Sequence, residues 1–164
     1  MAMPAVLEPI VTSWSSYYGD HQLVSVVMRY LHVAAILVGG GAAVALDRRV
    51  VRAARLGADA KRALLAELRG SHRVVVPALS LVVVTGVLMT AADLDTFLAS
   101  NLYWTKLGFV AALLVNGALL VAAESAAERA GDGAAWGRLT VAGLTSLALW
   151  LSTLFMGIWL TVGA

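Results

Sequence analysis

Four long apolar stretches dominate the sequence, and short polar segments separate each one from the next. Each stretch has about the 20 residues that an α-helix needs to cross a bilayer. The pattern predicts four transmembrane helices, at about residues 23–46, 73–92, 103–123 and 138–162. Because the connections are short, we expect a single all-α domain, an up-down-up-down four-helix bundle with antiparallel neighbours, over residues 1–164.

The longest connection, residues 47–72, is strongly basic and has a helical pattern of its own. Within residues 58–69, Leu64, Leu65 and Leu68 fall on one side of a helix and the charged residues fall elsewhere. We therefore expect a short amphipathic helix on the membrane surface between the first two spans.

Residues 1–20 lack the basic start and the long apolar core of a signal peptide. We expect them to lie at the membrane interface, where Pro4 and Pro9 break regular structure. The aromatic residue Trp14 is expected at the level of the lipid headgroups.

Composition strengthens the membrane interpretation. Hydrophobic residues make up 60% of the 164 residues and charged residues only 13%, and the mean hydropathy is +0.84. The chain has no Cys, which excludes disulfides, thiolate metal sites, iron–sulfur clusters and covalently attached haem. The sequence shows no catalytic triad and no phosphate-binding loop. Nucleic acid is not an expected partner of the basic residues, because basic clusters beside apolar spans usually set topology.

The basic residues predict the orientation of the spans. Eight of the twelve Lys and Arg residues lie between the first and second spans, and Arg129 and Arg138 lie between the third and fourth. Positive charge marks cytoplasmic loops, so we expect both termini on the outer side. The ten acidic residues are expected outside the span interiors, which argues against a carboxylate proton relay.

Candidate chemistry gathers in the first span, where Arg29 and His32 stand in an apolar run that continues to Gly39. Ionisable residues inside a membrane are costly and usually mark a functional site. Gly39 follows His32 by two helical turns, so we expect it to share the face of His32 and to leave room for a flat cofactor. The alternative is a buried imidazole that only forms a hydrogen bond across the bundle.

Helical rise assigns each polar residue a depth. His32 is expected in the outer half of the bundle and His72 near the inner boundary, about 20 Å away, so the two cannot bind the same iron. Met156 and Met89 are expected at outer depth and are candidate metal ligands beside His32, although Met is also an ordinary core residue.

Lys106 lies about one turn inside the third span, at the same outer depth. With Arg29 and His32 it forms an excess of positive charge that no acidic residue at that depth balances. A bound anion would balance it, and haem propionates, a quinone head group or an anionic lipid would each fit. A Lys this close to a span end can also extend to the membrane surface.

Short motifs in the first three spans form a recognisable set: Leu31-His32, Gly39-Gly40, Leu46-Asp47-Arg48-Arg49, Pro77, Thr85-Gly86 and Tyr103-Trp104-Thr105-Lys106-Leu107. This set resembles small bacterial membrane proteins of the HemJ-type protoporphyrinogen oxidase and CopD-like group, and most closely their uncharacterised four-span members. The resemblance implies haem b as cofactor, His32 and Lys106 as functional residues, and the bacterial inner membrane as location. The chain departs from the HemJ type in having no His at the cytoplasmic end of the first span.

These observations lead to three functional hypotheses. The first is a haem-b membrane protein that transfers electrons between a quinone or porphyrin-like donor and a partner, as a component of a membrane oxidoreductase or as the membrane subunit of a redox complex. The second is a cofactor-free accessory subunit that binds a protein partner or a second copy. The third is a transporter of copper or another metal ion, with ligands at His21, Met28, His32, Met89 and Met156.

Overall fold

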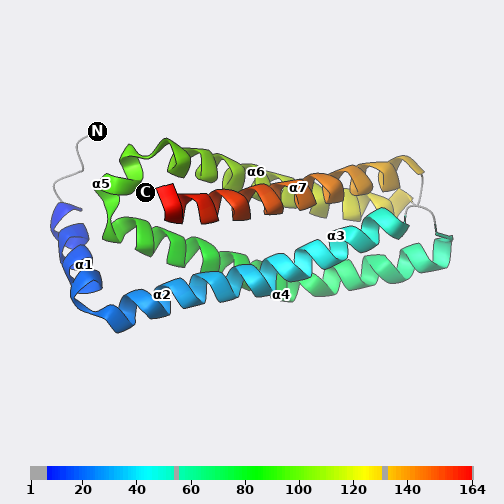
Figure 1. The fold of residues 1–164 in the computed structure, drawn as a ribbon. Coiled ribbons are helices and arrows are strands. Elements are labelled where there is room, and N and C mark those ends of the chain that lie inside the picture. Colours follow the sequence, from blue (N-terminus) through cyan, green and yellow to red (C-terminus); the bar gives the residue numbers. More distant parts are fainter. Residues whose placement is uncertain (1–6, 54–55, 131–132, 164) are drawn as a thin grey trace.

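The structure is a computed structural model that describes residues 7–53, 56–130 and 133–163, and helices make up nearly all of these residues (Figure 1). In chain order they are α1 (Glu8–Asp20), α2 (Gln22–Ala35), the π-helical turn η1 (Ile36–Gly40), α3 (Gly41–Ala53), α4 (Ala58–Ala92), α5 (Leu94–Ala99), α6 (Asn101–Ala130) and α7 (Gly133–Gly163). The all-α prediction is confirmed.

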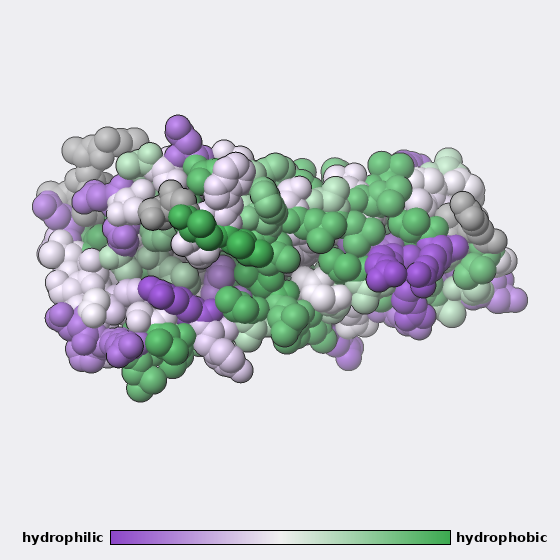
Figure 2. Space-filling view, in the orientation of Figure 1, coloured by the Kyte–Doolittle hydropathy of each residue, from purple (hydrophilic) through white to green (hydrophobic). Residues whose placement is uncertain are grey.

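Four helices are long and apolar enough to cross a membrane. The continuous run of α2, η1 and α3 forms the first (Gln22–Ala53), and α4, α6 and α7 supply the others. Only 6% to 22% of the most apolar part of each span is buried inside the protein, so most of the apolar surface faces outward. Figure 2 shows hydrophobic residues across the middle of one face and hydrophilic residues toward the ends. This distribution suits contact with a lipid bilayer.

The four long helices lie side by side and alternate in chain direction (Figure 1). α6 packs along α7, α2 and η1 pack on α4, and α3 lies against both α4 and α7. The α2–α4 pair therefore meets the α6–α7 pair mainly in the half that contains α3. Near α2, contact between the two pairs is sparse, and α4 touches α6 only locally.

The connection between the first two spans differs from the prediction. α3 continues to Ala53, and the segment at 58–69 is the first part of the 35-residue α4 rather than a separate surface helix. The reason is burial: Leu64, Leu65 and Leu68 join a core cluster with residues of α3, α6 and α7. Burying these side chains between helices removes more apolar surface from water than a surface helix would. α4 continues through Pro77, as membrane helices often do.

The N-terminal segment is helical where a broken interfacial segment was expected. Pro9 stands in the first turn of α1, where its missing N–H leaves no hydrogen bond unmade, while Pro4 lies outside the described residues. Trp14 Nε1 donates a hydrogen bond to the Leu88 carbonyl (2.8 Å), and Ser15 Oγ donates one to the Ala92 carbonyl (2.6 Å). These bonds hold α1 across the end of α4.

Candidate functional site

His32 lies half-buried on α2 and faces α4. Its ring nitrogen Nδ1 is 2.8 Å from Oγ1 of Thr85, a residue that is only 2% exposed. Thr85 Oγ1 in turn lies 2.6 Å from the Leu81 carbonyl oxygen and 3.2 Å from that of Val82. The imidazole is thus the first member of a short hydrogen-bond chain that ends on the backbone of α4.

This chain of bonds fixes the proton on the His32 ring. A carbonyl oxygen can only accept, so the single Thr85 hydroxyl proton is donated to Leu81 or Val82. The Thr85 oxygen must then accept from His32, and Nδ1 carries the hydrogen. In the neutral ring, Nε2 is left with a lone pair, which is the form in which a histidine binds a metal ion.

Gly86 provides the space for this ring. A Cβ added at Gly86 would lie 3.3 Å from His32 Cε1, closer than most Cβ contacts, and 3.9 Å from Nδ1, an ordinary contact distance. The Thr85-Gly86 pair therefore both binds and accommodates the imidazole. The sequence contained this pair as a motif, but only the packing of α2 on α4 shows that it faces His32.

Lys106 lies on α6 in the same half of the bundle. Its Nζ lies 3.7 Å from the position of a Cβ added at Gly157 of α7, so the side chain runs along α7. The ammonium group also interacts electrostatically with His32. Among the described residues no acidic side chain forms an ion pair with Lys106. One turn earlier, the Tyr103 hydroxyl donates a hydrogen bond to Thr90 Oγ1 (3.2 Å), which ties α6 to α4 beside the site.

Arg29 precedes His32 by one turn and is exposed. Within the part of the chain that the structure describes, it has no ion pair. The structure thus places His32 and Lys106 in the same half of the bundle and leaves Arg29 on the exposed surface of α2.

Gly39 has a different role from the one that the sequence suggested. It faces α4, as His32 does, but a Cβ added there would lie 2.6 Å from the Cβ of Ala78. Ala78 thus fills the space that was expected beside a flat cofactor, and Gly39 serves close helix packing instead. The next residue, Gly40, packs on the ring of Trp150 of α7, and a Cβ added there would lie 2.9 Å from that ring. The π-helical turn contains both glycines and lies one turn after His32.

The remaining candidate ligands are dispersed. Met89 and Met156 are half-buried on α4 and α7, and His21 is exposed, stacks on Tyr17 and bonds to its carbonyl (2.9 Å). His72 lies thirteen residues before Thr85 on α4, and its Nε2 forms a hydrogen bond with Glu124 (3.1 Å). That separation is about 20 Å along the helix, so His72 is far from His32, as predicted. No group of three His, Cys, Asp or Glu residues suited to a metal ion occurs among the described residues.

Two buried acidic residues were missed by the sequence analysis. Asp47 is 3% exposed and Glu124 is 4% exposed, and both lie within the long helices rather than outside them. Asp47 faces Gly143 and bonds to Ser146 of α7, while its Oδ2 is buried without a hydrogen bond. The spacing of Asp47 in the sequence could have predicted its burial. Asp47 follows Gly40 by seven residues, about two helical turns, and therefore faces α7 as Gly40 does.

Comparison with protein-family models, with curated proteins and with solved structures finds no match for this chain.

Proposed function

We propose that this protein is a membrane protein that binds haem b through His32 and acts in electron transfer or as the membrane subunit of a redox complex. The observation that carries the proposal is the hydrogen bond from His32 Nδ1 to Thr85 Oγ1. Histidines that bind metal ions almost always donate their other ring N–H to a fixed acceptor, which orients the ring and keeps the coordinating nitrogen unprotonated.

The residues around His32 fit haem chemically. Nε2 of His32 is the nitrogen that would bind the iron. Lys106 interacts with His32 and has no acidic partner among the described residues, so its ammonium group is free to bind a propionate. Arg29, one turn from His32 and exposed, is a second cation within the same end of the bundle. When bound, haem supplies one-electron redox chemistry, and the protein tunes it through the ligand and the surrounding charge.

The setting that we propose follows from the distribution of basic residues. The end of the bundle with most of the Lys and Arg residues faces the cytoplasm, which puts His32 in the outer half of a bacterial inner membrane. A quinone is a suitable electron donor at that depth. A protein partner or a second copy of the chain would bind along the outward-facing helices, most of whose apolar surface is not buried within the protein.

Absorption spectra of the purified protein test the proposal. We expect a Soret band in the protein as isolated, or after addition of haem, that is lost in His32→Ala. His21→Ala is the matched control, because it removes an exposed His near the same end of α2 and should leave the band unchanged. A protein without a Soret band, or one whose band is the same in His32→Ala, contradicts the proposal.

Metal analysis and co-purification separate the alternatives. Stoichiometric copper without iron or porphyrin would favour metal-ion transport, for which His32 is the one ligand that the structure orients through Thr85. A stoichiometric protein partner without any chromophore would favour the accessory subunit.

A further inference from the structure

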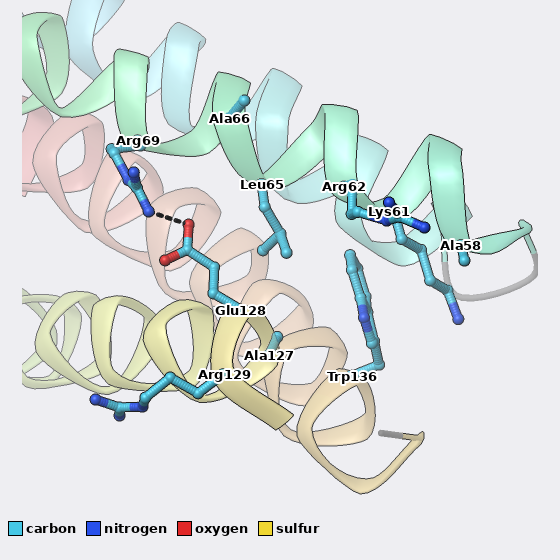
Figure 3. A pocket seen from close by; sticks show the side chains of 10 residues that line it. All are labelled: Ala58, Lys61, Arg62, Leu65, Ala66, Arg69, Ala127, Glu128, Arg129 and Trp136. Carbon is cyan, nitrogen blue, oxygen red and sulfur yellow. Dashed lines mark hydrogen bonds and ion pairs between the residues drawn. The ribbon is translucent and has the colours of Figure 1, made fainter. Parts of the chain in front are cut away.

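A second site lies at the opposite, basic end of the bundle. An open pocket of about 570 Å³ is formed there by the start of α4, the end of α6 and the start of α7 (Figure 3). Its volume is within the range of sites that bind small molecules. The residues that line it are Ala58, Lys61, Arg62, Leu65, Ala66, Arg69, Ala127, Glu128, Arg129 and Trp136.

The charged residues of this pocket leave positive charge unbalanced. Four of the lining residues are basic and only Glu128 is acidic. Glu128 is already paired with Arg69, and Arg62 pairs with the highly exposed Asp59 at 3.2 Å. Lys61 and Arg129 have no ion pair with any acidic residue that the structure describes. The Arg129 side chain points away from the opening in Figure 3, so a ligand with a negative charge would complement Lys61 and the neighbouring Arg62, whose pair with Asp59 is exposed.

The wall of the pocket is apolar. Trp136 is 5% exposed, and Lys61 Nζ lies 5.1 Å from the centre of its ring, a cation–π arrangement. Leu65 and Ala127 belong to the buried core beneath. In Figure 3 the Trp136 ring stands beside Lys61 and Arg62 and faces the opening between α4 and the ends of α6 and α7. A pocket that joins an apolar wall to free cations at the end of membrane-length helices suits an amphipathic anion.

We propose that this pocket binds an anionic phospholipid. Its phosphate headgroup lies beside Lys61 and Arg62, and the first carbons of its acyl chains lie along Trp136 and Leu65. Basic pockets between transmembrane helices on the cytoplasmic side are a recurring way to bind such headgroups. The site is independent of His32, which lies in the other half of the bundle, so either assignment can fail without the other.

Thermal unfolding of the detergent-purified full chain tests the site. Dioctanoyl phosphatidylglycerol should raise the unfolding midpoint of the wild type at lower concentrations than dioctanoyl phosphatidylcholine or inorganic phosphate. In Lys61→Gln/Arg62→Gln the concentration of phosphatidylglycerol needed for half of the effect should rise about tenfold or more. Arg48→Gln/Arg52→Gln removes the same charge from exposed positions of α3 and should respond as the wild type does.

Three outcomes would overturn the proposal. An equal response to phosphatidylcholine shows that the headgroup charge is not recognised. An equal response to inorganic phosphate assigns the pocket to a soluble anion. An equal loss in both double variants shows that binding depends on total charge and not on this pocket. If the Lys61→Gln/Arg62→Gln protein does not fold, Lys61→Gln against Arg52→Gln provides the same comparison with a single charge removed.

Discussion

His32 of α2 and Thr85 of α4 are joined by a 2.8 Å hydrogen bond in which Nδ1 donates and Oγ1 accepts. The acceptor is itself held by the α4 backbone, so the imidazole has a fixed orientation and a defined tautomer. The two residues are 53 positions apart in the chain. Their pairing gives a histidine in the middle of an apolar helix a fixed orientation.

Replacing Thr85 should affect His32 more than it affects the fold. Thr85→Val keeps the volume but removes the acceptor, so we expect a loss of about 0.5–2 kcal/mol in the free energy of unfolding. Thr85→Ser keeps the hydroxyl and should lose less. Denaturant unfolding in detergent measures both. If haem is bound, Thr85→Val should also weaken the Soret band, and equal behaviour of the two variants would contradict the role of the hydroxyl.

Gly39 should be intolerant of a larger residue. In Gly39→Ala the new Cβ would lie 2.6 Å from Ala78 Cβ, so α2 and α4 must separate, at about 1–3 kcal/mol. Gly41→Ala is the matched control, because nothing lies within 4 Å of a Cβ there and alanine favours the helix by up to about 1 kcal/mol. Thermal unfolding should show a lower midpoint for Gly39→Ala only. Equal midpoints would show that the helices do not approach this closely.

The His72–Glu124 pair should contribute more than an exposed ion pair. His72→Leu leaves the buried Glu124 carboxylate without its 3.1 Å partner, and we expect a loss of about 1–3 kcal/mol in the free energy of unfolding. Arg49→Gln breaks a pair with Glu67 whose side chains are 56% and 45% exposed, and should change stability by less than about 1 kcal/mol. Chemical denaturation compares the two, and a larger effect of Arg49→Gln would contradict the burial argument.

Asp47 should be a source of instability. Its Oδ2 is buried without a hydrogen bond, and an uncompensated buried charge is unfavourable. Asp47→Asn removes that charge and keeps an oxygen for Ser146, so we expect a gain of about 1 kcal/mol at neutral pH. Ser146→Ala removes the bond to Asp47 and should destabilise by a similar amount. A loss of stability in Asp47→Asn would mean that the charge has a partner in the membrane.

The sequence by itself determined the number, type and approximate place of the long helices. A run of about 20 apolar residues forms an α-helix in a bilayer, because a helix satisfies its own backbone hydrogen bonds there. The local sequence also identified His32 and Lys106 as candidates, since a charged side chain or an imidazole is rare within such an apolar run.

Only the tertiary structure decided what these residues touch. Whether Gly39 faces a cofactor or Ala78, and whether Thr85 bonds to His32, depend on how α2 and η1 pack on α4. Whether residues 58–69 lie on the membrane or in the core depends on how α4 packs against α3, α6 and α7. Asp47 and Glu124 were assigned to the loops because polarity was read along the chain, yet α7 and His72 of α4 cover them. Contacts between distant segments depend on helix rotation and close packing, which the hydrophobic pattern of a single helix does not specify when nearly every side of it is apolar.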